Sequence, residues 1–177
     1  TNQEYSGRCW LFAALNMLRP HVVSVVHDEE FAFSQNFLFF YDKLEKANTF
    51  FEMIIARADL DIRDPKFQFV LALPWDGPIQ DGGYWEYAVT LVGKYGAVPY
   101  SAMPDSESAR KPDEMNTQLT HKLMLDTYAL KRDYETNKSH DSMRTMPTHA
   151  LKDIYQNLVL HLGTPPAEFE FIHNHIE

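Results

Sequence analysis

Hydrophobic positions recur at the three-to-four-residue spacing of helices along most of this chain. Residues 9–19 are apolar on nearly every side, which predicts a central, buried helix. We expect Pro20 to end this helix, because proline disrupts a helix interior. Ser34 is a residue type that caps helix starts, so it predicts a second, long helix over 35–55.

The rest of the chain continues this pattern of helices separated by polar loops. Further helices are predicted over 67–73, 84–95, 113–134 and 150–162. Loops are predicted over 74–83, 101–112 and 135–147, where proline, glycine or polar residues gather. Residues 168–171 alternate between glutamate and phenylalanine, which is typical of the start of a β-strand. The sequence therefore predicts a predominantly helical domain whose end looks interrupted.

Composition narrows the possible partners and the compartment. The 177 residues are 45% hydrophobic and carry a formal net charge of -9. Nucleic acid and anionic membranes attract basic proteins, so neither is an expected partner. No apolar run in the sequence approaches the roughly 18 residues needed to span a bilayer, so no membrane-spanning helix is expected. A single cysteine cannot form an intrachain disulfide, which favours a reducing compartment.

That single cysteine, Cys9, stands where the first apolar helix should begin. The positive end of a helix favours the thiolate, which is the nucleophilic form of cysteine. The backbone N–H of Cys9 and the side-chain amide of Gln3 could together stabilise an oxyanion, and Gly7 allows a tight turn between them. The alternative is a buried, unreactive cysteine beside Trp10 and its apolar neighbours.

The segment Gln3…Gly7-Arg8-Cys9-Trp10 resembles the active-site segment of papain-like cysteine peptidases. Its wider form, Thr-Asn-Gln…Ser-Gly-Arg-Cys-Trp-Leu-Phe, is similar to the bleomycin hydrolase and aminopeptidase C branch. Residues 33–48, 81–85, 94–99 and 162–166 resemble the same branch. The resemblance therefore extends over essentially the whole chain.

This resemblance implies specific roles for site residues. Cys9 would be the nucleophile, Gln3 the oxyanion donor, and Gly82 and Gly83 would lie along the substrate groove. A simple turn before a helix is the alternative explanation for the two glycines. Ser6 departs from secreted relatives, which have a disulfide cysteine there. The resemblance further implies a cytoplasmic location, peptide substrates, a hexameric assembly, and no cofactor or metal.

The catalytic base is missing from the predicted site. Papain-like enzymes use a histidine roughly 130–150 residues after the cysteine. His140 and His149 fall in this window, but His140 lies in a polar loop and His149 precedes a helix, whereas the family histidine begins a strand. Neither is expected to be the base, so the histidine and its asparagine partner are expected beyond this chain.

The resulting prediction is an α+β peptidase of which residues 1–177 form one domain, the helical lobe, without its β-rich second lobe. We expect cysteine-dependent hydrolysis of peptide or amide bonds, with release of N-terminal residues, and little or no activity for this chain alone. The alternative is a non-catalytic helical interaction domain derived from such an enzyme.

Three other clusters suggest weaker possibilities. His173 and His175, near Glu177, could bind a metal, although terminal histidines are usually solvated. Glu4 and the acidic residues 28–30 could hold a substrate amine, although a solvated surface is the simpler interpretation. The aromatic run 37–41 is expected in the core or in a subunit interface.

Overall fold

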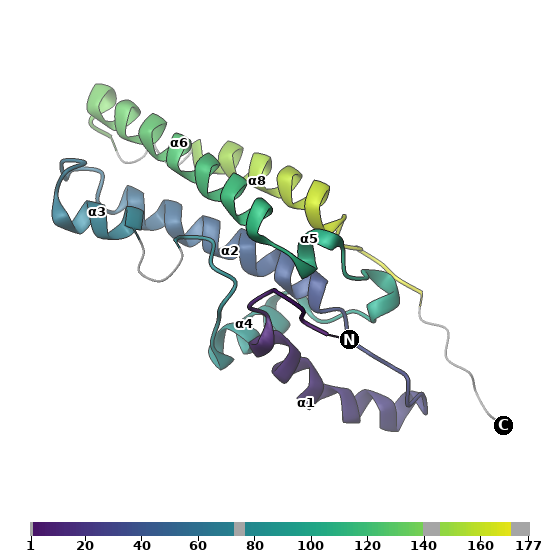
Figure 1. The fold of residues 1–177 in the computed structure, drawn as a ribbon. Helices are drawn as coiled ribbons and strands as arrows, with labels where there is room; N and C mark the ends of the chain where they lie inside the picture. The colour runs from purple at the N-terminus through teal and green to yellow at the C-terminus, as the bar shows by residue number, and fades with distance from the viewer. Residues whose placement is uncertain (1, 73–76, 140–145, 171–177) are drawn as a thin grey trace. The chain divides into compact units, whose positions relative to one another are not determined.

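The structure is a computed structural model that describes residues 2–72, 77–139 and 146–170. Its helices are α1 (Cys9–Val26), α2 (Gln35–Ile55), α3 (Pro65–Ala72), α4 (Trp85–Tyr95), α5 (Glu107–Arg110), α6 (Asp113–Asn137) and α8 (Met146–Leu162), with a 3-10 turn, η1, at Tyr100–Ala102 (Figure 1). Within these described ranges there is no β-strand, only an isolated antiparallel bridge between Phe33 and Pro99. The prediction of a predominantly helical lobe is confirmed.

The chain divides into two compact units. The first contains the described residues of 1–42, 81–112 and 159–177, and the second those of 43–80 and 113–158. Every site residue predicted from the sequence belongs to the first unit. The expectation of one domain over 1–177 stays a prediction.

Helix α1 begins at Cys9 as predicted, but it continues through Pro20 to Val26. The expected stop at Pro20 is therefore wrong. Pro20 is exposed, so the backbone carbonyl that loses its helical partner can be solvated, which lowers the cost of the proline. The helix ends at His27, whose backbone is left-handed (φ 54°) and whose N–H donates to the carbonyl of Val23 at 2.9 Å.

Burial along α1 is uneven, which corrects the expectation of a wholly buried central helix. Its buried side chains all lie in the first half, at Trp10, Leu11, Ala14 and Leu15. The second half is largely exposed, with Val25 at 75%. By length and composition alone this continuous helix could cross a membrane, contrary to the sequence expectation, but the core helix of a folded unit meets the same criterion.

The start of α2 joins three segments of the first unit. Ser34 accepts the N–H of Phe37 at 3.0 Å, which confirms its predicted role as an N-cap. The side-chain amide of Asn36 donates to the carbonyls of Pro104 and Leu162, each at 2.8 Å. Asn36 therefore holds the loop before α5 and the end of α8 against the start of α2.

In the second unit, two lysines of α2 hold the loop that leads toward Asp81. Buried Lys43 donates to the carbonyl of Ile79 at 2.5 Å, and Lys46 donates to the carbonyl of Gln80 at 2.7 Å. A buried ammonium group that donates to backbone carbonyls satisfies polar groups which the loop itself leaves without partners.

Several predicted boundaries change. Residues 101–112 are not entirely a loop, because Ser106 accepts the N–H of Ala109 at 3.0 Å and caps the short helix α5. Helix α6 extends to Asn137 and α8 begins at Met146, so both are longer than predicted. The strand expected over 168–171 is absent from 168–170, and residue 171 lies outside the described residues.

Candidate active site

The thiol of Cys9 lies exposed at the first residue of α1. The carbonyl of Arg8 accepts the N–H groups of Leu11 and Phe12, at 2.9 and 3.1 Å, and so starts the helix. The first N–H groups of a helix have no hydrogen-bond partner within the helix. The N–H of Cys9 is one of them, since Cys9 is the first residue of α1. An exposed thiol and a free helical N–H therefore occur on the same residue.

Asp81 bonds to residues on both sides of Cys9: the backbone of Gly7 and the side chain of Trp10. Its carboxylate oxygen Oδ2 accepts the N–H of Gly7 at 3.2 Å, and its carbonyl accepts the indole N–H of Trp10 at 2.9 Å. These contacts place the segment before α4 against the start of α1, and the two helices contact each other (Figure 1). The predicted glycine segment thus lies beside the predicted nucleophile.

Gly83 and Gly7 lie at the closest approaches of these two segments. A Cβ atom on Gly83 would be 2.5 Å from Cε2 of Trp10, and one on Gly7 would be 2.9 Å from Cβ of Asp81. Both contacts are shorter than real Cβ atoms make, so the packing requires glycine at each position. This packing gives Gly83 a structural reason to be glycine that is separate from any contact with substrate.

Gln3, the predicted oxyanion donor, is half-buried in the turn before α1. Its carbonyl accepts both the N–H of Ser6, at 3.1 Å, and the hydroxyl of Ser6, at 2.7 Å. Glu4, between them, has a left-handed backbone (φ 51°), which is uncommon for a residue other than glycine. Such strained residues occur often at functional sites and persist where neighbours hold them.

Arg8 is the residue at this site that the sequence interpretation missed. Its guanidinium group is fully buried and binds the carboxylate of Asp105 through two nitrogens, at 2.8 and 3.2 Å. Its Nε donates to the hydroxyl of Ser6 at 2.8 Å. The rings of Phe12 and Phe39 each lie 5.4 Å from the guanidinium carbon, within range of a cation–π interaction. The only signal in the sequence was a charged residue within an otherwise apolar and small segment.

The described residues do not supply a base for the thiol. In the ranges covered by the structure, no histidine is hydrogen-bonded to Cys9. His149 lies exposed within α8, in the second unit, and His140 lies outside the described residues. The cluster His173, His175 and Glu177 also lies outside them. Among the described residues no three potential metal ligands gather.

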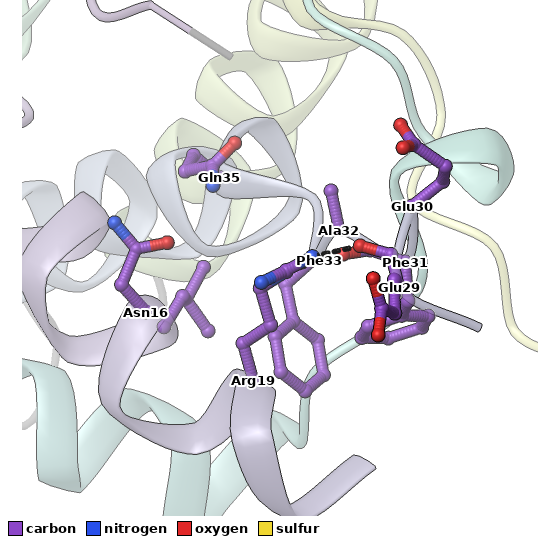
Figure 2. A pocket seen from close by; sticks show the side chains of 9 residues that line it. Asn16, Arg19, Glu29, Glu30, Phe31, Ala32, Phe33 and Gln35 are labelled. Carbon is purple, nitrogen blue, oxygen red and sulfur yellow. Dashed lines mark hydrogen bonds between the residues drawn. The ribbon is translucent and has the colours of Figure 1, made fainter. Parts of the chain in front are cut away.

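The acidic residues singled out in the sequence have different surroundings. Glu29 and Glu30 line a cavity of about 390 Å³ between α1 residues 15–19 and the segment 29–35 (Figure 2). Arg19 crosses this cavity and donates to the carbonyls of Phe31, at 2.6 Å, and Glu29. Glu4 instead approaches Arg110, with 3.7 Å between the charged atoms. The cavity therefore lies beside the middle of α1, and Cys9 does not line it.

Helical architecture, an exposed thiol at a helix start and an adjoining glycine segment define the class: the helical lobe of a papain-like cysteine peptidase. The chain belongs to the Peptidase C1-like family, which it matches over residues 1–176.

Similar proteins support this assignment. Aminopeptidase C of Streptococcus thermophilus is 40% identical over 171 residues, which cover 97% of this chain and 38% of that protein. Cysteine proteinase 1, mitochondrial, of Saccharomyces cerevisiae (strain YJM789) is 40% identical over 172 residues, covering 95% of this chain and 34% of that protein. The crystal structure of PepW from Lactobacillus rhamnosis HN001 superposes with a TM-score of 0.88 at 39% identity, covering 97% of this chain and 37% of that one. The chain thus spans little more than a third of the length of these relatives.

Proposed function

We propose that this chain carries the nucleophile and the oxyanion donors of a cysteine aminopeptidase. The observation that supports it best is the exposed Cys9 thiol at the first residue of α1, fixed on both sides by Asp81. The relatives named aminopeptidase C support the same activity. The histidine base and its asparagine partner would come from polypeptide outside this chain.

In this mechanism the Cys9 thiolate attacks the carbonyl carbon of a peptide bond. The negative charge that develops on the carbonyl oxygen is stabilised by the N–H of Cys9 and the side-chain amide of Gln3. The C–S bond forms first and gives this oxyanion; the C–N bond breaks as the oxyanion collapses, and the departing amine takes its proton from the protonated base. Water then hydrolyses the thioester, which releases the acid and restores the thiol.

Gly82 and Gly83 would border the groove for the substrate backbone, since residues without a Cβ allow a second chain to approach closely. Because Gly83 already packs against Trp10, Gly82 is the better candidate for direct contact with substrate. Peptides are the proposed substrates, without a cofactor. A hexameric assembly and a cytoplasmic location follow from family resemblance, although the yeast relative is named mitochondrial.

Acylation of the chain tests this function without the missing base. An activated ester, p-nitrophenyl acetate, has a leaving group that needs no protonation, so Cys9 should form one acetyl thioester per chain. The burst of p-nitrophenolate and a matching mass increase at Cys9 would measure it, and Cys9→Ala should abolish both. Hydrolysis of an aminoacyl p-nitroanilide should be undetectable, because the amine leaving group requires the base.

The same experiment separates the enzyme from a non-catalytic interaction domain. An interaction domain has no oxyanion donors, so Cys9 would be acylated no faster than a small model thiol with the same thiolate fraction. That result, together with an acylation rate in Gln3→Ala equal to that of the parent chain, would contradict the proposed function.

A further inference from the structure

We propose that Arg8, anchored by Asp105, is a positioning residue that holds the oxyanion donor Gln3 in place through Ser6. The proposal rests on the proposed function, because it assigns a task to Gln3 that only an acyl-transfer site needs. It adds three residues to the site that do not touch the substrate.

The chain of contacts is continuous and largely buried. Asp105 binds Arg8 through two oxygens, Arg8 Nε donates to the hydroxyl of Ser6, and that hydroxyl donates to the carbonyl of Gln3. Ser6 is 3% exposed and Arg8 is fully buried. Every link lies within hydrogen-bond distance, at 2.7 to 3.2 Å.

The direction of each bond explains why these residue types occur. A guanidinium group has donors in a fixed fork, so it can satisfy a carboxylate with one edge while Nε points elsewhere. A hydroxyl group can accept from Arg8 and donate to Gln3 at the same time. Neither a lysine at position 8 nor an alanine at position 6 can make this connection.

Burial of the charge shows that the arrangement is more than a surface ion pair. Burying a guanidinium and a carboxylate is costly, and apolar residues of similar volume often stabilise a protein as well or better. Arg8 also lies directly before Cys9, and its carbonyl starts α1. Arg8 therefore connects two parts of the site: its backbone carbonyl starts the helix that carries the nucleophile, and its side chain binds the turn that carries the oxyanion donor.

Two reactions of Cys9 distinguish positioning from general stability. Acylation by p-nitrophenyl acetate passes through an oxyanion, whereas alkylation by iodoacetamide displaces iodide and does not. The measured quantity is the rate of acylation divided by the rate of alkylation at the same pH. Both rates are proportional to the thiolate fraction, so this ratio reports oxyanion stabilisation alone. Loss of one oxyanion donor costs on the order of 10²-fold in rate, so Gln3→Ala should lower the ratio by about that factor.

Ser6→Ala, Arg8→Lys and Asp105→Asn should each lower the same ratio by on the order of 10-fold, because displacement of a catalytic group by about 1 Å can cost up to roughly 10²-fold. Arg19→Met is the matched control: it removes side-chain hydrogen bonds to the carbonyls of Phe31 and Glu29 in the same unit, but none that leads to Asp105, Ser6 or Gln3. It should lower the melting temperature and leave the ratio unchanged. Circular dichroism checks that each variant is folded, and Ser6→Ala, which keeps the ion pair, decides the matter if Arg8→Lys does not fold.

The outcomes separate the two proposals. If Gln3→Ala lowers the ratio but Ser6→Ala and Asp105→Asn do not, positioning by Arg8 is wrong and the proposed function stands. If Arg19→Met lowers the ratio as much as Asp105→Asn, the effect is general destabilisation and positioning is again wrong. If Gln3→Ala itself leaves the ratio unchanged, both proposals fail.

Discussion

The indole ring of Trp10 occupies the space in which a side chain of residue 83 would begin, 2.5 Å from the position of a Cβ atom on Gly83. Trp10 cannot easily move away, because its indole N–H is bonded to the carbonyl of Asp81 and the residue is only 9% exposed. The residue after the nucleophile and the glycine segment therefore share one packing arrangement.

Gly83→Ala should consequently destabilise the chain by about 1–3 kcal/mol, the usual cost of inserting a group into a packed site. Urea unfolding followed by circular dichroism measures this free energy. Gly93→Ala in helix α4 is the matched control, because a Cβ atom there meets nothing within 4 Å. It should stabilise the chain by about 0.5–1 kcal/mol, since alanine is the better helix former. Equal effects of the two substitutions would show that the Trp10 contact is not restrictive.

Removal of Arg8 should be among the most destabilising single changes. Arg8→Met leaves the carboxylate of Asp105, whose side chain is 4% exposed, without its partner. Breaking a buried pair in this way costs about 3–5 kcal/mol. The double substitution Arg8→Met with Asp105→Leu should recover much of that loss, because no charge remains buried. A double-mutant cycle on unfolding free energies measures the coupling, and simple addition of the two single effects would contradict it.

Asn36→Leu should destabilise the chain by about 2–3 kcal/mol. The substitution leaves the carbonyls of Pro104 and Leu162 without their amide donor, and an unsatisfied buried group costs about 1–3 kcal/mol. Asn137→Leu, at an exposed position of α6, should change the unfolding free energy by less than about 0.5 kcal/mol. Thermal and urea unfolding of both variants test the difference.

Lys122 should give the stability of the chain a dependence on alkaline pH. Burial lowers the pKa of Lys122, but hydrogen bonds and charge attraction from Asp126 and Asp153 outweigh it, so the pKa is raised above its ordinary value of 10.5. A raised pKa means that the folded state holds the proton more tightly than the unfolded state. The stabilisation is therefore complete below pH 10.5 and is lost as the pH rises through the folded pKa.

The comparison of the parent chain with Lys122→Met shows this loss directly. Their difference in unfolding free energy should be at most about 1 kcal/mol, since the pair is partly solvated, and should shrink above pH 10.5. Lys122→Arg is the control, because arginine keeps its charge throughout this range. If the unfolding free energies of the parent chain and the arginine variant depend on pH in the same way up to pH 12, the assignment of this pH dependence to Lys122 is wrong.

Local sequence signals predicted the elements of the site better than their connections. Cys9 at a helix start and Ser34 as an N-cap follow from short-range rules, and both are confirmed. Asp105 lies 97 residues from Arg8, so no local pattern could predict their pairing. The same limit applies to Asp81, whose contacts with Gly7 and Trp10 depend on how the chain returns to α1.

The errors also have physical causes. Pro20 ends a helix by the usual rule, but an exposed proline loses only one bond, which water can replace, and the helix continues. The short helix α5 depends on one cap at Ser106 and has too few residues to show a period. The bonds of Ser6 were missed because its residue type was interpreted only as the absence of a disulfide.

The uneven attachment of α1 has a mechanical consequence. Its first turn is held by Asp81 and by the buried Arg8, whereas its last turns, from Pro20 to Val26, are largely exposed. Thermal bending of the helix will therefore pivot about its beginning, and the amplitude of displacement will grow toward Val26. Cys9 lies at the pivot, so bending of the helix should displace its backbone less than that of Val26.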